Sequence, residues 1–201
     1  MSCSLVMLAG PSDAGTIRMM FRHADRMSRF PFQFRALTID TLPSPSHPAG
    51  SLATAQLIAE AEDMKSSGEI DAVFRTSDPA EDIERKHFGH SLKRKRDFRN
   101  IPLLGWAIGI ERAPTDFVCH FDSDILMHTS GTFSWVLAAI TEIENHADIL
   151  FVAPRGVRRQ TLARRPASAR CSPAAASSSI VAGWRACFRC RRLTRRGSAR
   201  R

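Results

Sequence analysis

Asp116-Phe117-Val118-Cys119-His120-Phe121-Asp122-Ser123-Asp124 is the stretch that decides the fold of this chain. Its apolar residues predict a short buried strand that ends abruptly at two carboxylates. Because side chains alternate along a strand, Asp122 and Asp124 are expected on the same face where the strand ends. Two such carboxylates repel each other when they lose water, and a hard divalent cation relieves that repulsion. The stretch therefore predicts a Mg²⁺ or Mn²⁺ site completed by substrate phosphates; two solvated aspartates in a loop are the alternative.

The segments on either side of this stretch alternate between strand and helix patterns. Apolar runs predict further strands at 5–9, 32–39, 71–75 and 149–152. Helical spacing predicts helices that begin after Ser12, after Ser51, at Pro102, and after Thr129 or Ser130. This alternation predicts an α/β fold with a mostly parallel sheet and helices on both faces.

Two of the predicted helices carry clear apolar stripes. Their inward residues are expected to be Ile17, Met20, Phe21, Ala24 and Met27 in the first helix, and Phe133, Val136, Leu137, Ile140 and Ile143 in the last.

Acidic residues follow two of the predicted strands at the end where such sheets bind ligands. Asp40 comes directly after the second strand, and Asp122 to Asp124 end the acidic strand. Ligands of parallel α/β sheets bind outside the carboxyl ends of the strands. That agreement is the main evidence from the residues for a functional site.

Two basic clusters lie outside this edge. Arg18, Arg22 and Arg26 are expected on the solvent face of the first helix, with Arg18 near enough to a strand end to reach a phosphate. Residues 79–99 are charged and helix-permissive and contain Lys93-Arg-Lys-Arg96. We expect a solvated face there; a counter-charge for a diphosphate or for an acidic acceptor is the alternative.

The composition changes abruptly at Pro154. Residues 155–201 hold fourteen arginines and no lysine, aspartate or glutamate, so the formal charge of +9 describes this tail, and residues 1–154 are net acidic. A segment rich in Arg, Ala and Ser cannot bury enough apolar surface to offset its ordering entropy. We predict a disordered tail after a folded region 1–154. Its composition is that of a GC-rich gene read out of frame, and a nucleic-acid-binding arm is the alternative.

The cysteines and the hydropathy of the sequence argue against a zinc site, a membrane span and a secretory leader. Cys3 and Cys119 lie in apolar runs and are expected to be buried, and Cys187-Phe-Arg-Cys190 lacks the second ligand pair of a zinc site. No apolar run is long enough for a membrane span, and no secretory leader pattern precedes the first strand. These features predict a cytoplasmic protein, with peripheral membrane contact left open. Nucleic acid is an unlikely partner, because the acidic body opposes it.

Residues 1–154 resemble the donor-binding half of a nucleotide-sugar glycosyltransferase of the GT-A type, similar to family 2. The specific part is Gly105-Trp-Ala-Ile-Gly109-Ile-Glu-Arg-Ala113-Pro-Thr-Asp-Phe-Val-Cys-His-Phe-Asp122-Ser-Asp124, a helix, a turn, an apolar strand and an Asp-x-Asp motif. The first strand ending near Gly10 and the second ending in Asp40 complete the pattern. The resemblance implies a GT-A, Rossmann-like fold.

The resemblance also implies roles for three residues. Asp122 and Asp124 would hold Mn²⁺ or Mg²⁺ and the donor's ribose and diphosphate, and Asp40 would contact the nucleotide base or ribose. Where family members often have Asn in the helix before the acidic strand, this chain has Ala107. The family's second half, which usually supplies the acceptor site and the catalytic carboxylate, has no counterpart after Pro154.

The resemblance therefore implies a truncated glycosyltransferase that binds a nucleotide-diphosphate sugar, with its catalytic base and its hydroxyl acceptor unassigned. His128 and Glu142 follow the motif but are expected in a loop and on a solvent face. Two alternatives stay open. A sugar-nucleotidyltransferase shares the architecture, and residues 8–18 faintly resemble its phosphate-cradling loop. A nucleic-acid-binding protein would act through the basic tail.

Overall fold

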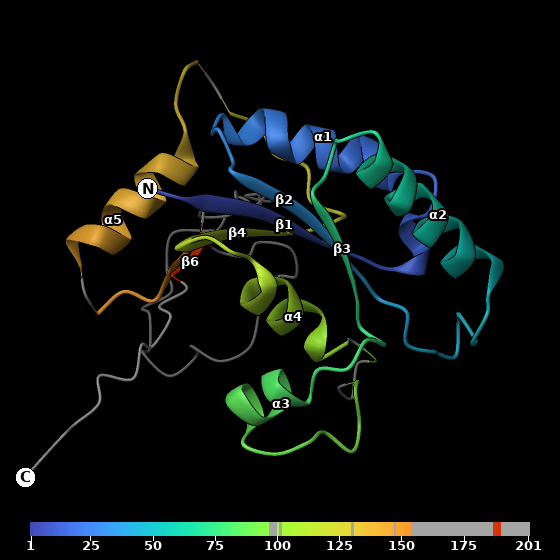
Figure 1. Ribbon diagram of the computed structural model, residues 1–201. Helices are drawn as coiled ribbons and strands as arrows, with labels where there is room; N and C mark the ends of the chain where they lie inside the picture. Colours follow the sequence, from blue (N-terminus) through green and yellow to red (C-terminus); the bar gives the residue numbers. More distant parts are fainter. Residues whose placement is uncertain (97–99, 101, 130, 147, 154–186, 190–201) are drawn as a thin grey trace, which may run out of the picture.

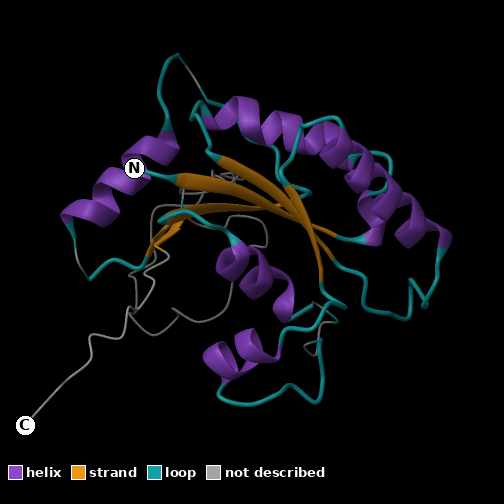
Figure 2. Ribbon diagram, in the orientation of Figure 1, coloured by secondary structure: helices purple, strands orange, loops and turns teal. Residues whose placement is uncertain are grey.

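The computed structural model describes residues 1–96, 100, 102–129, 131–146, 148–153 and 187–189. In this part of the chain, a twisted sheet is covered by helices on both faces (Figures 1 and 2). The strands are β1 (Cys3–Ala9), β2 (Phe34–Ile39), β3 (Ala72–Arg75), β4 (Phe117–Asp122), β5 (Phe151–Val152) and β6 (Cys187–Arg189). The helices are η1 (Pro11–Asp13, a 3₁₀ turn), α1 (Ile17–Ser28), α2 (Leu52–Ser66), α3 (Glu81–Phe88), α4 (Leu104–Arg112) and α5 (Trp135–Asn145). The predicted α/β fold is confirmed, and the sheet is compatible with a Rossmann-like architecture.

The order of the strands places a topological switch point beside β1. The described strands follow the order β3-β2-β1-β4-β6-β5, and the four from β3 to β4 are parallel. From β1 the chain builds β2 and β3 on one side and then crosses to build β4 on the other. In sheets of this kind, ligands bind outside the carboxyl ends of the strands where the order reverses. Here that place lies between the ends of β1 and β4.

Alternate residues of β1 divide the core into two layers. Leu5 and Met7 belong to the larger apolar cluster, with residues of α1, α2 and α5. Val6 faces the opposite side, toward α4, and α3 packs behind α4 (Figure 1). All three β1 side chains are 0–1% exposed, so β1 is a central strand buried on both faces.

Two glycines let α4 lie directly on the sheet. A Cβ atom at Gly109 would lie 2.6 Å from Val6 Cγ1 and 2.8 Å from Thr38 Oγ1, and one at Gly105 would lie 2.7 Å from Leu8 Cδ1. No ordinary side chain fits at the first position without displacing buried atoms. Close packing of α4 is therefore built into the glycine spacing that leads to β4.

The helix starts differ from the predicted ones at three places. α4 begins at Leu104, two residues after the predicted Pro102. Ser12 lies in η1 and does not cap α1, which begins after Thr16 because the chain first closes a turn from Gly10 to Asp13. α5 begins after Ser134, whose Oγ accepts a hydrogen bond from Leu137 N and donates one to Ser28 O. Thr129, predicted as a cap of this helix, instead donates to Met27 O. The predicted Ser51 cap of α2 is confirmed, with Thr54 N as its donor.

The apolar stripes are confirmed except at three residues. Phe133 and Leu137 are 59% and 49% exposed, because Phe133 precedes α5 and Leu137 lies on its outer side. Met27 is half-buried. The remaining residues of both stripes are buried.

Within the predicted tail, Cys187–Arg189 is the segment that the structure describes, and it does not follow the predicted disorder. It forms β6, antiparallel to β4 and to β5, and fills the place beside β4. The edge of β4 offers backbone donors and acceptors to any short extended segment, which is the physical reason for the difference. The other tail residues, 154–186 and 190–201, lie outside the described residues.

Candidate functional site

The carboxyl edge of the parallel sheet brings Asp40 and Asp122 to the same face. Leu8 of β1 pairs in register with Thr38 on one side and with Asp122 on the other. Asp40 is two residues beyond Thr38, and side chains two apart share a face, so both carboxylates lie on the α4 side. One strand separates them, which corresponds to about 10 Å at ordinary strand spacing. The predicted edge therefore exists, with β1 between its two acidic parts.

Asp40 is buried and already bound by protein groups. The residue is 6% exposed. Oδ1 accepts hydrogen bonds from Thr76 Oγ1 at 3.1 Å and from Leu42 N at 3.2 Å. Oδ2 accepts one from Arg96 Nη2 at 2.7 Å. A ligand that contacts Asp40 must share it with Arg96 or displace Arg96.

Arg96 closes the Asp40 side of the edge. Its guanidinium also donates to the carbonyl oxygens of Leu42, Pro43 and Asn100, so it ties the loop after β2 to the segment before α4. Five donors in a rigid fork suit such multiple contacts. Arg96 therefore holds two segments of the chain together at this edge. The basic cluster in the sequence did not indicate this role.

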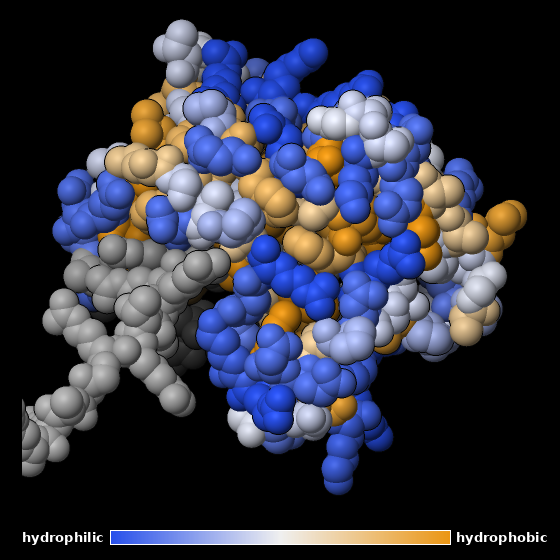
Figure 3. All heavy atoms as spheres, in the orientation of Figure 1, coloured by the Kyte–Doolittle hydropathy of each residue, from blue (hydrophilic) through white to orange (hydrophobic). Residues whose placement is uncertain are grey.

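The basic cluster is divided between two roles. Lys93 and Arg94 are exposed, as predicted for a solvated face, and Figure 3 shows hydrophilic residues over the α3 side of the molecule. Lys95 instead donates to Glu84, a residue that is 1% exposed. That hydrogen bond lowers the pKa of Glu84, against burial, which raises it; the Leu92 backbone N–H also lowers it. The expectation of a solvated face is wrong for Lys95 and Arg96.

The Asp-x-Asp motif forms a turn around a buried serine. Asp122 is half-buried at the end of β4, Ser123 is 7% exposed, and Asp124 is exposed. Ser123 N donates to Leu8 O at 3.1 Å, which continues the sheet by one residue. The buried Ser123 thus lies between a half-buried Asp122 and an exposed Asp124.

Asp13 is a third acidic residue at this place, and the sequence analysis missed it. Its Oδ2 accepts hydrogen bonds from Ser123 Oγ at 2.6 Å and from Gly10 N at 2.7 Å. The contact joins the loop after β1 to the motif after β4, across the switch point. An acidic residue three positions after the glycine that ends a strand was the available signal.

The donor set suits a hard cation only in part. Carboxylate oxygens are ligands that Mg²⁺ and Mn²⁺ prefer. However, no group of three or more His, Cys, Asp or Glu side chains capable of holding a metal occurs among the residues that the structure describes. Asp122 and Asp124 therefore fit an ion that takes its other ligands from water and from a bound phosphate.

The loop after β1 offers few donors to a phosphate. Gly10 N is bound by Asp13, Asp13 N by Gly10 O, Ala14 N by Pro11 O and Thr16 N by Asp13 O. Gly15 N donates to Glu60 at 2.9 Å. A phosphate-cradling loop needs such N–H groups to be available.

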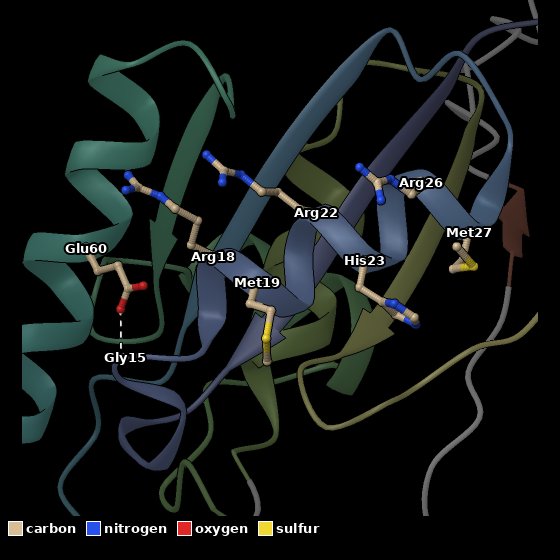
Figure 4. A pocket seen from close by; sticks show the side chains of 8 residues that line it. All are labelled: Gly15, Arg18, Met19, Arg22, His23, Arg26, Met27 and Glu60. Atoms are coloured by element: carbon tan, nitrogen blue, oxygen red, sulfur yellow. Dashed lines mark hydrogen bonds between the residues drawn. The ribbon is translucent and has the colours of Figure 1, made fainter.

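A hollow of about 550 Å³ lies elsewhere, along the outer side of α1. Figure 4 shows Arg18, Arg22 and Arg26 in one row, and Met19, His23 and Met27 in a second row. Arg18 contacts Asp63 and Glu69, and Arg22 contacts Glu69 at 2.8 Å. Much of the row's charge is therefore neutralised by α2 and the turn that follows it, and Arg18 is held away from the role of phosphate ligand.

The two residues considered near the motif lie on the surface. His128 is exposed, and Glu142 is exposed and pairs with His146 at 3.2 Å. Both positions agree with the expected loop and solvent face.

Comparison with known proteins adds no assignment. Neither a protein-family model, nor a curated protein, nor a solved structure matches this chain. No helix in the described part of the chain is long and apolar enough to cross a membrane.

Proposed function

We propose that this chain binds a nucleoside diphosphate, the leaving part of a nucleotide-sugar donor, together with Mg²⁺ or Mn²⁺ at the carboxyl edge of its sheet. The observation that carries the proposal is the position of the Asp122-Ser123-Asp124 turn. It stands at the switch point and is tied to the loop after β1 by the Ser123–Asp13 hydrogen bond. The function belongs to a glycosyltransferase-like protein of the GT-A type.

Each acidic residue has a distinct proposed role. Asp124, the exposed member of the motif, contributes a carboxylate oxygen to the metal ion. Because Asp124 lies at the surface, the ion can also bind water and phosphate oxygens. Asp122 contributes a second oxygen or contacts the ribose. Asp40 contacts the nucleoside from the far side of β1, with Arg96 beside it. The metal, when bound, neutralises the diphosphate as a leaving group.

Transfer of a sugar needs a further group. A base must accept the proton of the acceptor hydroxyl. None of the described residues near the motif has that assignment, so donor binding, and not transfer, is the activity that these residues support.

The sugar-nucleotidyltransferase alternative is less well supported. Such an enzyme needs a loop whose backbone N–H groups can bind the triphosphate. Here the backbone N–H groups of residues 10 and 13–16 donate to other groups of the protein. The nucleic-acid alternative depends on tail residues that mostly lie outside the described residues. Salt-dependent nucleic-acid binding by the full chain, with no metal-dependent binding of nucleotides, would favour it.

Calorimetric titration tests the proposal. The full chain is titrated with several nucleoside diphosphates, in Mn²⁺, in Mg²⁺ and in a chelator. We expect binding that requires the metal, and weak binding of the metal alone, because two carboxylates do not complete its shell. Equal binding in the chelator, or no binding of any nucleoside diphosphate, would contradict the proposal.

A further inference from the structure

His23 connects α1 to the loop that follows the Asp-x-Asp motif. The backbone N–H of Met127 donates a 3.0 Å hydrogen bond to His23 Nε2. A backbone amide nitrogen is only a donor, so His23 Nε2 must be the acceptor and carry no proton. The bond therefore exists only with a neutral imidazole whose proton is on Nδ1. A protonated ring cannot accept this hydrogen bond.

The loop held by this bond begins at the proposed site. Met127 is three residues after Asp124 and is 7% exposed; Ile125, between them, is 6% exposed. Thr129 Oγ1 donates to Met27 O at 3.2 Å one turn further along α1. In the part of the chain that the structure describes, the His23 bond is the hydrogen bond that ties residues 125–128 to α1.

We propose that His23 is a proton-sensitive anchor of residues 125–128. As the pH falls, loss of this anchor releases these residues from α1 and so weakens the site at Asp124. Protonation turns Nε2 into a donor that faces the Met127 donor, so the bond is lost and a buried N–H loses its partner. The effect on ligand binding rests on the proposed function; the effect on the loop does not.

Charged residues of α1, α2 and the loop lie around His23. The charged side chains that line the hollow with His23 are Arg18, Arg22 and Arg26 of α1 and Glu60 of α2. Asp124 and His128 are the titratable residues nearest to Met127 in the loop that His23 contacts. Figure 4 shows the His23 side chain pointing away from the row of arginines. Imidazole side chains, here His23 and His128, are the groups among these that ordinarily change charge between pH 5 and 8.

Amide exchange measured by NMR on the full chain tests the anchor. Protection of the Met127 amide, corrected for intrinsic exchange, is followed from about pH 7.5 to pH 5.5, the range of imidazole titration. We expect it to fall about three- to tenfold, as for the loss of one hydrogen bond. In His23→Gln, whose Oε1 accepts near the position of Nε2 and takes no proton, protection stays constant over this range. Constant protection in the wild type, or an equal fall in His23→Gln, would overturn the proposal.

A matched control and a ligand arm complete the experiment. His146→Gln removes an exposed imidazole directly after α5 and should leave the wild-type behaviour of Met127 unchanged. Binding of a nucleoside diphosphate with Mn²⁺ should weaken over the same pH range in the wild type and in His146→Gln, and much less in His23→Gln. If His23-dependent protection is seen without any nucleotide binding, the anchor stands and the proposed function fails. If nucleotides bind with the same affinity over this pH range, control of the site by His23 is refuted.

Discussion

Ser123 Oγ donates a 2.6 Å hydrogen bond to Asp13 Oδ2 and so joins two loops that are 110 residues apart in the chain. The same oxygen of Asp13 accepts from Gly10 N. One carboxylate thus holds the end of β1 and the turn after β4 together. This contact fixes the turn that carries Asp122 and Asp124 to the centre of the sheet, at the switch point.

Replacing Asp13 should loosen this turn. Asp13→Ala removes the acceptor of two hydrogen bonds, so we expect a loss of about 1–3 kcal/mol in the free energy of unfolding. Asp13→Asn keeps a side-chain oxygen and should lose less. Urea unfolding of both variants beside the wild type gives the comparison. An alanine variant as stable as the wild type would show that the contact does not hold the turn.

The Asp40–Arg96 pair should set the affinity for the nucleoside. Arg96→Gln removes a charge-assisted bond from a buried carboxylate, and Asp40 then becomes available to a ligand or is left without its counter-charge. We expect the affinity for nucleoside diphosphates to change severalfold while the metal requirement stays. Asp40→Ala should likewise act on the nucleoside portion alone. Calorimetry with different bases measures this, and a lost metal requirement would contradict the assigned role.

How far the sequence predicts the fold can be seen at β4. The run from Phe117 to Phe121 is apolar except for His120, and it predicts a buried strand because strands buried on both faces are mostly apolar. The strand is there, with Asp122 at its end. The helix cap at Ser134 was missed, because Thr129 and Ser130 offer the same local chemistry. In the structure Ser134 Oγ donates to Ser28 O, a contact between residues 106 apart that the local sequence does not indicate.

The contacts of the site were less predictable. Asp40 and Asp122 follow strands, so their common edge could be inferred from the sequence. Arg96 contacts Asp40 across 56 residues, and nothing in the spacing of a basic run indicates which of its members turns inward. Asp13 was missed for a similar reason, since its partner Ser123 lies in the motif but is itself neither acidic nor basic.

Glu84 should make the stability of the chain depend on pH in the acid range. The Lys95 hydrogen bond lowers the pKa of this buried carboxyl below its ordinary value. Stability from a lowered pKa is present above the unfolded value, near 4.3, and is lost as the pH falls through the folded value. The free energy of unfolding should therefore fall below about pH 4.5, and less steeply in Glu84→Gln.

Lys95→Met is the companion variant, since it leaves the Glu84 carboxylate buried without its cation. We expect a loss of about 1–2 kcal/mol near pH 7, discounted because Lys95 is 41% exposed. The loss should shrink in acid as Glu84 takes up a proton. Urea unfolding across pH measures both effects, and a loss that is the same at all pH values would mean that charge is not its cause.

Gly109 and Gly105 should differ in their tolerance of alanine. Alanine favours a helix by about 1 kcal/mol over glycine at either position. At Gly109 the new Cβ meets Val6 and Thr38, which are both fully buried, and overpacking costs about 1–3 kcal/mol. At Gly105 it meets the end of Leu8, which is half-buried and can rotate. Gly109→Ala should lower the melting temperature more than Gly105→Ala, and the reverse order would contradict the close packing of α4.

The central claim is that Asp124 holds a metal together with a nucleoside diphosphate. Asp124→Asn keeps the size of the side chain and removes its charge, and Asp116→Asn makes the same change at the opposite end of β4, where Asp116 contacts Ser2. Loss of one carboxylate also relieves its repulsion with Asp122, so the effect can be smaller than a count of ligands suggests.

The measurement is calorimetric binding of a nucleoside diphosphate in Mn²⁺ to the wild type and to these two variants. We expect Asp124→Asn to weaken binding by about tenfold or more, as for loss of a charged ligand, and Asp116→Asn to bind as the wild type does. Binding that is indifferent to Asp124→Asn would contradict the account.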